Sequence, residues 1–258
     1  MSEREFEFVH KNPKSFITTG DMGDVIYHLL FIKKLGGTKY HIDPSPTSYE
    51  RNGYIRVGDG NPGKFNLTKA LFLLPLIKKQ SYLEDVDLYN SEPSRAWQYY
   101  DVHTGEYHKD DLGMQNLVQF HAKKYGLPLD ELNEPWLEVK SARRVDPNRD
   151  TVISRTLRYR GNDNYYYFNR ERLNQRGVFV GLGEEYTDFV QRFGCVNVPL
   201  RRVDTALEMA EVINGHQHFV GNGSLVASIA LGLGLEIEYE FCPAAAHYLF
   251  KRDNINIF

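Results

Sequence analysis

The chain has 258 residues, of which 41% are hydrophobic, and a formal net charge of −3. It can bury a substantial core as one large or two small domains, and its charge is too small to imply a nucleic-acid or membrane partner. Its two cysteines exclude a disulfide framework, and its longest apolar run, residues 70–77, is far shorter than the roughly 20 residues that span a bilayer. Because the charged N-terminus lacks a signal-peptide core, we expect a cytoplasmic protein without a membrane span.

The first half begins with a strand-turn-helix pattern. A β-prone run at 15–19 is followed by a Gly-Asp turn and an apolar helix that extends to Leu35. Asn66 is the predicted N-cap of a second helix. The region between 89 and 112 is polar, aromatic and irregular, which predicts loops with room for one strand around 99–103. The other elements predicted here are strands at 38–42 and 54–57 and helices at 67–79 and 117–126.

The second half has a more regular pattern. Short apolar or β-branched runs alternate with helical stretches, which indicates βαβ units and a parallel sheet. The predicted strands lie at 151–155, 178–182, 195–200, 218–221 and 235–241, and the predicted helices lie near 165–173, 184–193, 206–213 and 224–231.

A linker is predicted at 141–150, because this segment has no apolar periodicity and contains a proline. We therefore expect an N-terminal α/β domain at 1–146 and a C-terminal α/β domain at 147–258. The predicted fold class is α/β, with two Rossmann-like doubly wound domains that face each other across a cleft.

The strand-to-helix turns are the candidate binding sites, because ligands of doubly wound domains lie beyond the carboxyl ends of the strands. Three turns contain glycine, at 20–24, 181–185 and 221–225. The last, GNGSL, opens a helix whose N-terminal amides and positive dipole end suit an anion. Alternatively, Asn222 or Ser224 only caps that helix. This turn alone leaves both interpretations open.

Arginines follow the first predicted strand of the second half. Arg155 and Arg158 are the better candidates for phosphate contact, since a guanidinium can hold two phosphate oxygens at once. Arg143, Arg144 and Arg149 precede that strand, and we interpret these three as a solvated basic linker.

Two motifs carry a resemblance to a known family. MGDVIYHL at 22–29 and FVGNGSLVASIALGLG at 219–234 are similar to segments of the ADP-heptose:lipopolysaccharide heptosyltransferases and related GT-B glycosyltransferases, as is the stretch at 66–89. The resemblance covers most of the chain in order, and the first motif is the close one. The family's late motif is Asp-Thr/Ser-Gly followed by His. Here Asn222, Gly223 and Ala227 replace the acid, the hydroxyl residue and the His, which preserves backbone phosphate binding and leaves the donor sugar open.

Asp24 has two interpretations. The resemblance implies a general base that takes the proton of an acceptor hydroxyl, and a helix N-terminus favours its ionised form. The spacing alone favours a capping box, in which Asp21 is the N-cap and Asp24 satisfies a backbone donor. With the whole MGDVIYHL motif, we expect Asp24 to be the base while Asp21 caps the helix.

Three further patterns suggest other chemistry but have simpler interpretations. GDGNPGK at 58–64 fits a GxGxxG motif, although Pro62 stands where the helix should begin, so we predict a turn. The DVD pattern at 85–87 matches a metal-binding motif, but here it joins a helix to a strand. NYYYFNR at 164–170 is predicted to be a packing surface. The sequence has neither a zinc HExxH motif nor a GxSxG nucleophile elbow.

The predicted function is a glycosyltransferase that moves a sugar from a nucleotide diphosphate sugar to a hydroxyl acceptor, such as a glycan or a modified base, with inversion and without a metal or cofactor. Glu185 is expected at the ribose, although it equally suits the start of a helix. Alternatives are a non-catalytic nucleotide or nucleotide-sugar-binding module, and a glycosyltransferase acting on modified nucleic-acid bases. The predicted donor-binding residues are Gly23, Arg155, Arg158, Gly181, Glu185, Gly221, Asn222, Gly223, Ser224 and Leu225.

Overall fold

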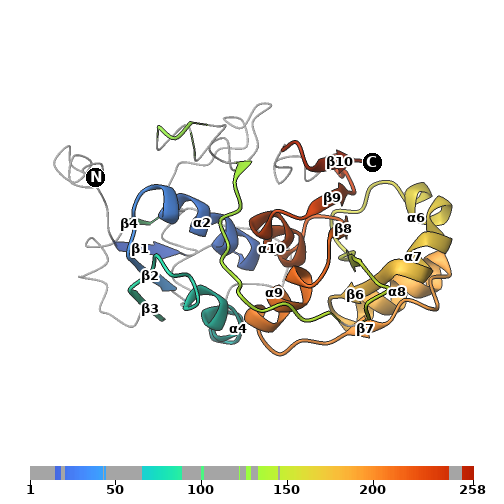
Figure 1. Ribbon diagram of the computed structural model, residues 1–258, viewed down its shortest axis with the longest axis horizontal. Coiled ribbons are helices and arrows are strands. Elements are labelled where there is room, and N and C mark those ends of the chain that lie inside the picture. The colour runs from blue at the N-terminus through green and yellow to red at the C-terminus, as the bar shows by residue number, and fades with distance from the viewer. Residues whose placement is uncertain are drawn as a thin grey trace, which may run out of the picture. The chain divides into compact units, whose positions relative to one another are not determined.

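Figure 1 shows the computed structural model, which divides into two compact units, Met1–His108 and Lys109–Phe258. The described residues are 15–18, 21–42, 44, 66–88, 100–101, 122, 126–128, 133–144, 146–243 and 252–258. The predictions at Gly20, 54–57 and 58–64, and most of the helix predicted at 117–126, lie outside these residues. No helix in the described part of the chain is both long and apolar enough to cross a membrane.

The first unit contains a parallel sheet in the order β3-β2-β1-β4. Its strands are β1 (Ser15–Thr18), β2 (Lys39–Ile42), β3 (Asp85–Leu88) and β4 (Tyr100–Asp101). The strand predictions at 15–19 and 38–42 are therefore confirmed, and the DVD pattern forms most of β3.

Two described helices accompany this sheet. Helix α2 (Met22–Lys34) follows β1, and every residue from Val25 to Ile32 is buried, which explains why this stretch is apolar except for His28. Helix α4 (Leu67–Ile77) begins where predicted, because Asn66 Oδ1 accepts a hydrogen bond from Lys69 N at 3.0 Å. Both elements were recognisable from local sequence signals.

The second unit contains a six-stranded parallel sheet in the order β10-β9-β8-β5-β6-β7. Its strands are β5 (Thr151–Ser154), β6 (Gly177–Val180), β7 (Leu200–Arg201), β8 (His218–Gly221), β9 (Glu236–Tyr239) and β10 (Ile255–Ile257). Its helices are α6 (Asn164–Phe168), α7 (Arg170–Arg176), α8 (Gly183–Phe193), α9 (Ala206–Asn214) and α10 (Leu225–Leu233). These elements confirm the predicted strand-helix alternation, and β10 is a strand that the sequence analysis missed.

The strand order identifies a topological switch point. The chain moves from β5 outward through β6 to β7, then returns to the other side of β5 and continues through β8 and β9 to β10. This is the doubly wound order 3-2-1-4-5-6, in which ligands bind where the direction reverses. In this unit that place is the carboxyl edge between β5 and β8.

An aromatic core supports β5 and β6. Tyr166 of α6 is fully buried and stacks on Phe193 of α8, with ring centroids 4.8 Å apart. The same cluster contains Ile153, Phe179 and Phe189. The prediction that residues 164–170 form a packing surface is thus confirmed for Tyr166.

Residues 133–144 belong to the second unit, and part of this segment packs against helix α10. The amides of Trp136 and Leu137 donate to Gly232 O at 2.9 and 3.0 Å. The expectation of a solvated linker is wrong for Arg149, whose guanidinium donates to the carbonyls of Asn174, Gly177 and Asn197. These carbonyls lie in α7, at the start of β6 and in the turn before β7, and no local pattern associates them with residue 149.

Candidate functional site

The switch point is formed by the adjacent ends of β5 and β8. Ser154 lies opposite Gly221 in register, and Asn222 N donates to Ser154 O at 3.3 Å. A Cβ atom at Gly221 would lie 1.8 Å from Ser154 O, so the two strand ends approach too closely for any side chain there. Because it has no side chain, Gly221 allows the GNGSL turn to lie directly beside the end of β5.

Helix α10 begins at this turn with Ser224 as its N-cap. Ser224 Oγ accepts a hydrogen bond from Ala227 N at 3.1 Å, which confirms the capping interpretation for this residue. The amides of Leu225 and Val226, in the first turn, have no partner within the helix. They provide donors to an anion at the positive end of the helix dipole.

Asn222 does not cap the helix, and its buried carboxamide instead binds the loop between β5 and α6 (155–163). Oδ1 accepts from Thr156 N at 2.9 Å and from Thr156 Oγ1 at 3.2 Å. Nδ2 donates to Thr156 O at 3.2 Å and to Tyr159 O at 3.3 Å. The side chain thus uses its donor and acceptor ends to join the two loops of the switch point.

Two tyrosines lie beside Gly223. A Cβ atom there would lie 2.8 Å from Tyr239 Oη and 3.5 Å from Tyr159 Cδ2. Tyr159 has a φ of 29°, a left-handed conformation that is costly for a bulky side chain. Gly223 therefore permits close packing of the turn against aromatic side chains of β9 and of the β5–α6 loop.

Arg155 is buried under the β5–α6 loop and pairs with carboxylates of its own chain. Its Nε and Nη2 donate to Glu240 at 2.8 and 2.7 Å, and Nη2 also donates to Asp163 at 2.6 Å. Burial lowers the pKa of the guanidinium, but the hydrogen bond and charge of Glu240 outweigh this effect and raise it. Nη1 has no hydrogen-bond partner within the described residues. Contact between Arg155 and a donor phosphate stays a prediction.

Glu240, which directly follows β9, is fully buried and was missed by the sequence analysis. It accepts from Arg155, from Gly161 N at 2.7 Å and from Tyr166 Oη at 3.0 Å. Burial, reinforced by the charge of Glu240, raises the pKa of Tyr166 well above its usual range, so its hydroxyl remains a neutral donor. An acid directly after one strand and an arginine directly after another were the available signals.

Arg158 and Arg160 differ in their surroundings. Arg158 is exposed, with its guanidinium carbon 5.1 Å from the centroid of the Tyr159 ring, and no described carboxylate pairs with it. Arg160 pairs with Asp188 of α8 at 2.5 Å. Among the arginines of this loop, Arg158 is the one that the described structure leaves available to an anionic ligand.

The turn between β6 and α8 contains Gly181 and Glu185. Glu185 Oε2 accepts from Leu182 N at 2.9 Å, so this acid begins the helix, as the alternative interpretation held. Burial raises the pKa of Glu185, while the Leu182 hydrogen bond and the charges of Arg158 and Arg160 oppose that rise. A Cβ atom at Gly181 would lie 2.9 Å from Glu185 Oε2. The ribose contact of Glu185 stays a prediction.

Asp24 and Gly23 lie in the first turn of α2, in the first unit. Asp24 Oδ2 accepts a hydrogen bond from Asp21 N at 2.9 Å, which confirms that Asp24 satisfies a backbone donor at the start of the helix. Its role as a general base and the contact of Gly23 with a donor stay predictions.

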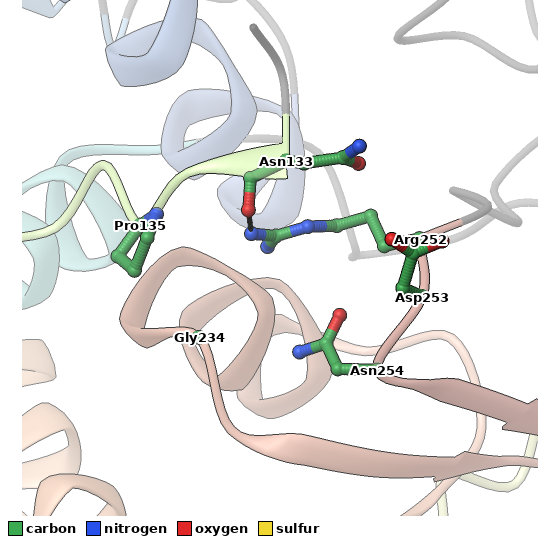
Figure 2. A pocket seen from close by; sticks show the side chains of 6 residues that line it. All are labelled: Asn133, Pro135, Gly234, Arg252, Asp253 and Asn254. Carbon is green, nitrogen blue, oxygen red and sulfur yellow. Dashed lines mark hydrogen bonds between the residues drawn. The ribbon is translucent and has the colours of Figure 1, made fainter. Parts of the chain in front are cut away.

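A pocket of about 240 Å³ lies away from the switch point, at the end of the sheet where β10 begins. Figure 2 shows the Arg252 guanidinium directed at the main-chain carbonyl of Asn133. Arg252 also donates to Leu231 O at 2.8 Å, at the C-terminal end of α10, and burial lowers its pKa. Its visible role is to anchor residue 133 and this helix end. None of the predicted site residues lines the pocket.

Comparison with solved structures identifies the fold. The chain is similar to the dodecameric iron-containing heptosyltransferase TibC, solved in complex with ADP-D-beta-D-heptose, with a TM-score of 0.56 and 11% identity over 95% of this chain and 63% of TibC. A second structure of TibC, from enterotoxigenic E. coli H10407, gives a TM-score of 0.53 and 12% identity over 95% of this chain and 62% of TibC. E. coli ADP-heptose lps heptosyltransferase II gives a TM-score of 0.50 and 11% identity over 95% of this chain and 90% of that chain.

The chain spans less than two thirds of the length of TibC. No family model matches the sequence, and the comparison with curated proteins finds no match. The similarity at this identity is one of fold, and it extends over nearly the whole chain. The chain is a distant structural relative of the heptosyltransferases, as its two sequence motifs predicted.

Proposed function

We propose that this protein is a glycosyltransferase that moves a sugar from a nucleotide diphosphate sugar to a hydroxyl acceptor. One observation carries the proposal: the GNGSL turn and the N-terminus of α10 lie at the switch point between β5 and β8. Diphosphates bind at such helix N-termini, and nucleotides bind at such switch points. The fold is also that of TibC, which was solved with ADP-D-beta-D-heptose.

The donor contacts follow from the geometry of the second unit. The amides of Leu225 and Val226 and the exposed guanidinium of Arg158 would bind the diphosphate, whose charge the helix dipole and the arginine offset without a metal ion. The ribose would lie toward Glu185, on the neighbouring turn. These assignments use donors that the described structure leaves available.

The transfer step requires a base. In an inverting transfer, the acceptor oxygen attacks the anomeric carbon from the face opposite the leaving diphosphate, and the acceptor proton passes to a carboxylate. We propose Asp24 for this role, since the start of α2 favours an ionised side chain. The acceptor would be a hydroxyl of a glycan or of a modified base.

Calorimetric titration of the full chain with ADP, GDP, UDP and CDP, and with the matching nucleosides, tests the proposal. At least one diphosphate should bind more tightly than its nucleoside by about tenfold or more, because the helix N-terminus and Arg158 contact the phosphates. Arg158→Ala should abolish most of this difference. Arg202→Ala, at an exposed arginine following β7, is the matched control and should leave it unchanged.

A positive binding result should be followed by incubation with the corresponding nucleotide sugars and measurement of diphosphate release. Binding of a nucleotide sugar without transfer or hydrolysis would identify a non-catalytic module, an alternative favoured by Asn222 and Ala227 in place of the family's acid and His. If none of the four diphosphates binds, the proposed function is wrong.

A further inference from the structure

We propose that Asn222 is a positioning residue, whose carboxamide holds the β5–α6 loop so that Arg158 faces the donor diphosphate; this inference rests on the proposed function. It explains why an amide occupies a position where the resembling family has an acid. A carboxylate can accept the two hydrogen bonds from Thr156, but it cannot donate to Thr156 O and Tyr159 O.

The burial of Asn222 makes this chemical difference important. Asn222 is 0% exposed, so water cannot replace a lost hydrogen-bond partner of its side chain. An aspartate would place its negative charge against these two carbonyl oxygens and could donate to neither of them, which is costly in a buried site. The amide therefore matches the loop that it holds, independently of any ligand contact.

The conformation of the loop shows why it needs to be held. Tyr159 has a φ of 29°, and such a conformation persists only when surrounding interactions determine it. The carbonyl of this same residue is the one bonded to Asn222 Nδ2 at 3.3 Å. Arg158 directly precedes Tyr159, so the direction in which its side chain leaves the backbone depends on this local geometry.

The loop is also held at positions on either side of Arg158. Gly161 N donates to Glu240 Oε1 at 2.7 Å, and Arg160 pairs with Asp188 at 2.5 Å. Arg155 is buried against Glu240. These interactions occupy the neighbouring cations, whereas Arg158 is exposed and pairs with no described carboxylate. A rigid loop that carries one available cation beside a helix N-terminus is a preorganised site for a diphosphate.

A double-mutant cycle in ADP affinity, measured by calorimetry on the full chain with GDP, UDP and CDP in parallel, tests this inference. Asn222→Ala and Arg158→Ala should each weaken binding of the preferred diphosphate by about tenfold or more. The double variant should bind no more weakly than Arg158→Ala alone, because Asn222 acts through that guanidinium. A purely structural role would not produce this non-additivity.

Asn174→Ala is the matched control. Asn174 of α7 also uses both ends of its carboxamide, accepting from Asn197 N at 2.9 Å and donating to Gly194 O at 3.4 Å, but both partners lie in the loop between α8 and β7, which does not belong to the switch point. This variant should lower the melting temperature without changing diphosphate affinity.

Three outcomes overturn the inference. Additive losses would show that Asn222 acts independently of Arg158, unchanged affinity in Asn222→Ala would show a structural role alone, and unchanged affinity in Arg158→Ala would remove the cation from the site. In each case, tight binding by the wild type would leave the proposed function intact, whereas absence of wild-type binding would overturn both. If Asn222→Ala does not fold, Asn222→Asp replaces it in the cycle. Only the part of its loss in affinity that is absent when Arg158 is already Ala then counts as positioning.

Discussion

Replacing Glu240 by Gln should strongly destabilise the second unit. Glu240 is 0% exposed and accepts hydrogen bonds from Arg155 Nε and Nη2, Gly161 N and Tyr166 Oη at 2.7–3.0 Å. The Gln side chain would keep one acceptor oxygen, but its NH2 group would face the N–H and O–H donors that now bind Glu240. The buried Arg155 guanidinium would also lose the carboxylate that is its main partner. Removing one partner of a buried ion pair typically costs about 3–5 kcal/mol.

For a unit of this size, that cost corresponds to a decrease in melting temperature of about 6–20 °C. The control is Glu238→Gln, on the same strand. Glu238 pairs with Arg172 at 2.7 Å, but the two side chains are 23% and 40% exposed, so the loss should not exceed about 1 kcal/mol. Arg155→Leu/Glu240→Leu should recover much of the stability lost in Glu240→Gln, because no buried charge then lacks its partner.

The assay is thermal unfolding followed by tryptophan fluorescence in a Trp97→Phe background. Trp97 belongs to the first unit, so Trp136, which is 1% exposed, then reports on the second unit alone. A decrease in melting temperature for Glu240→Gln no larger than that for Glu238→Gln would refute the assigned role of the buried pair.

Three further perturbations test other parts of the structure. Asp24→Asn should lower the rate of sugar transfer by about 10²–10⁴-fold while the affinity for the nucleotide sugar changes little. A rate within a few-fold of wild type would make Asp24 a capping residue only. Gly221→Ala should destabilise by about 1–3 kcal/mol in chemical denaturation, because its Cβ would lie 1.8 Å from Ser154 O, whereas Gly183→Ala, which meets nothing within 4 Å, should not. Burial lowers the pKa of His216, so as the pH decreases the unfolded chain takes up a proton at this residue before the folded protein does. The free energy of unfolding should therefore fall as the pH decreases from about 7 to 5, and this fall should be smaller in His216→Gln. The same pH dependence in both proteins would contradict the assigned shift of His216.

The sequence by itself determined most of the described secondary structure, because the relevant signals are local. Asn66 and Ser224 cap the helices that follow them, and apolar periodicity distinguishes strands from helices within a few residues. Alternation of these elements was sufficient to predict parallel α/β units, and two short motifs predicted the heptosyltransferase fold. The strand β10 was missed because its three residues are too short to show a period.

Only the tertiary structure decided which side chains meet at the candidate site. Arg155 and Glu240 are 85 positions apart, and Asn222 and Thr156 are 66 apart, so their contacts depend on the order of β9, β8 and β5 in the sheet. The sequence placed Arg155 and Arg158 equally well for a phosphate. Burial against Glu240 separates their roles, because a charge removed from water requires a partner inside the protein, whereas a charge left in water remains available to a ligand.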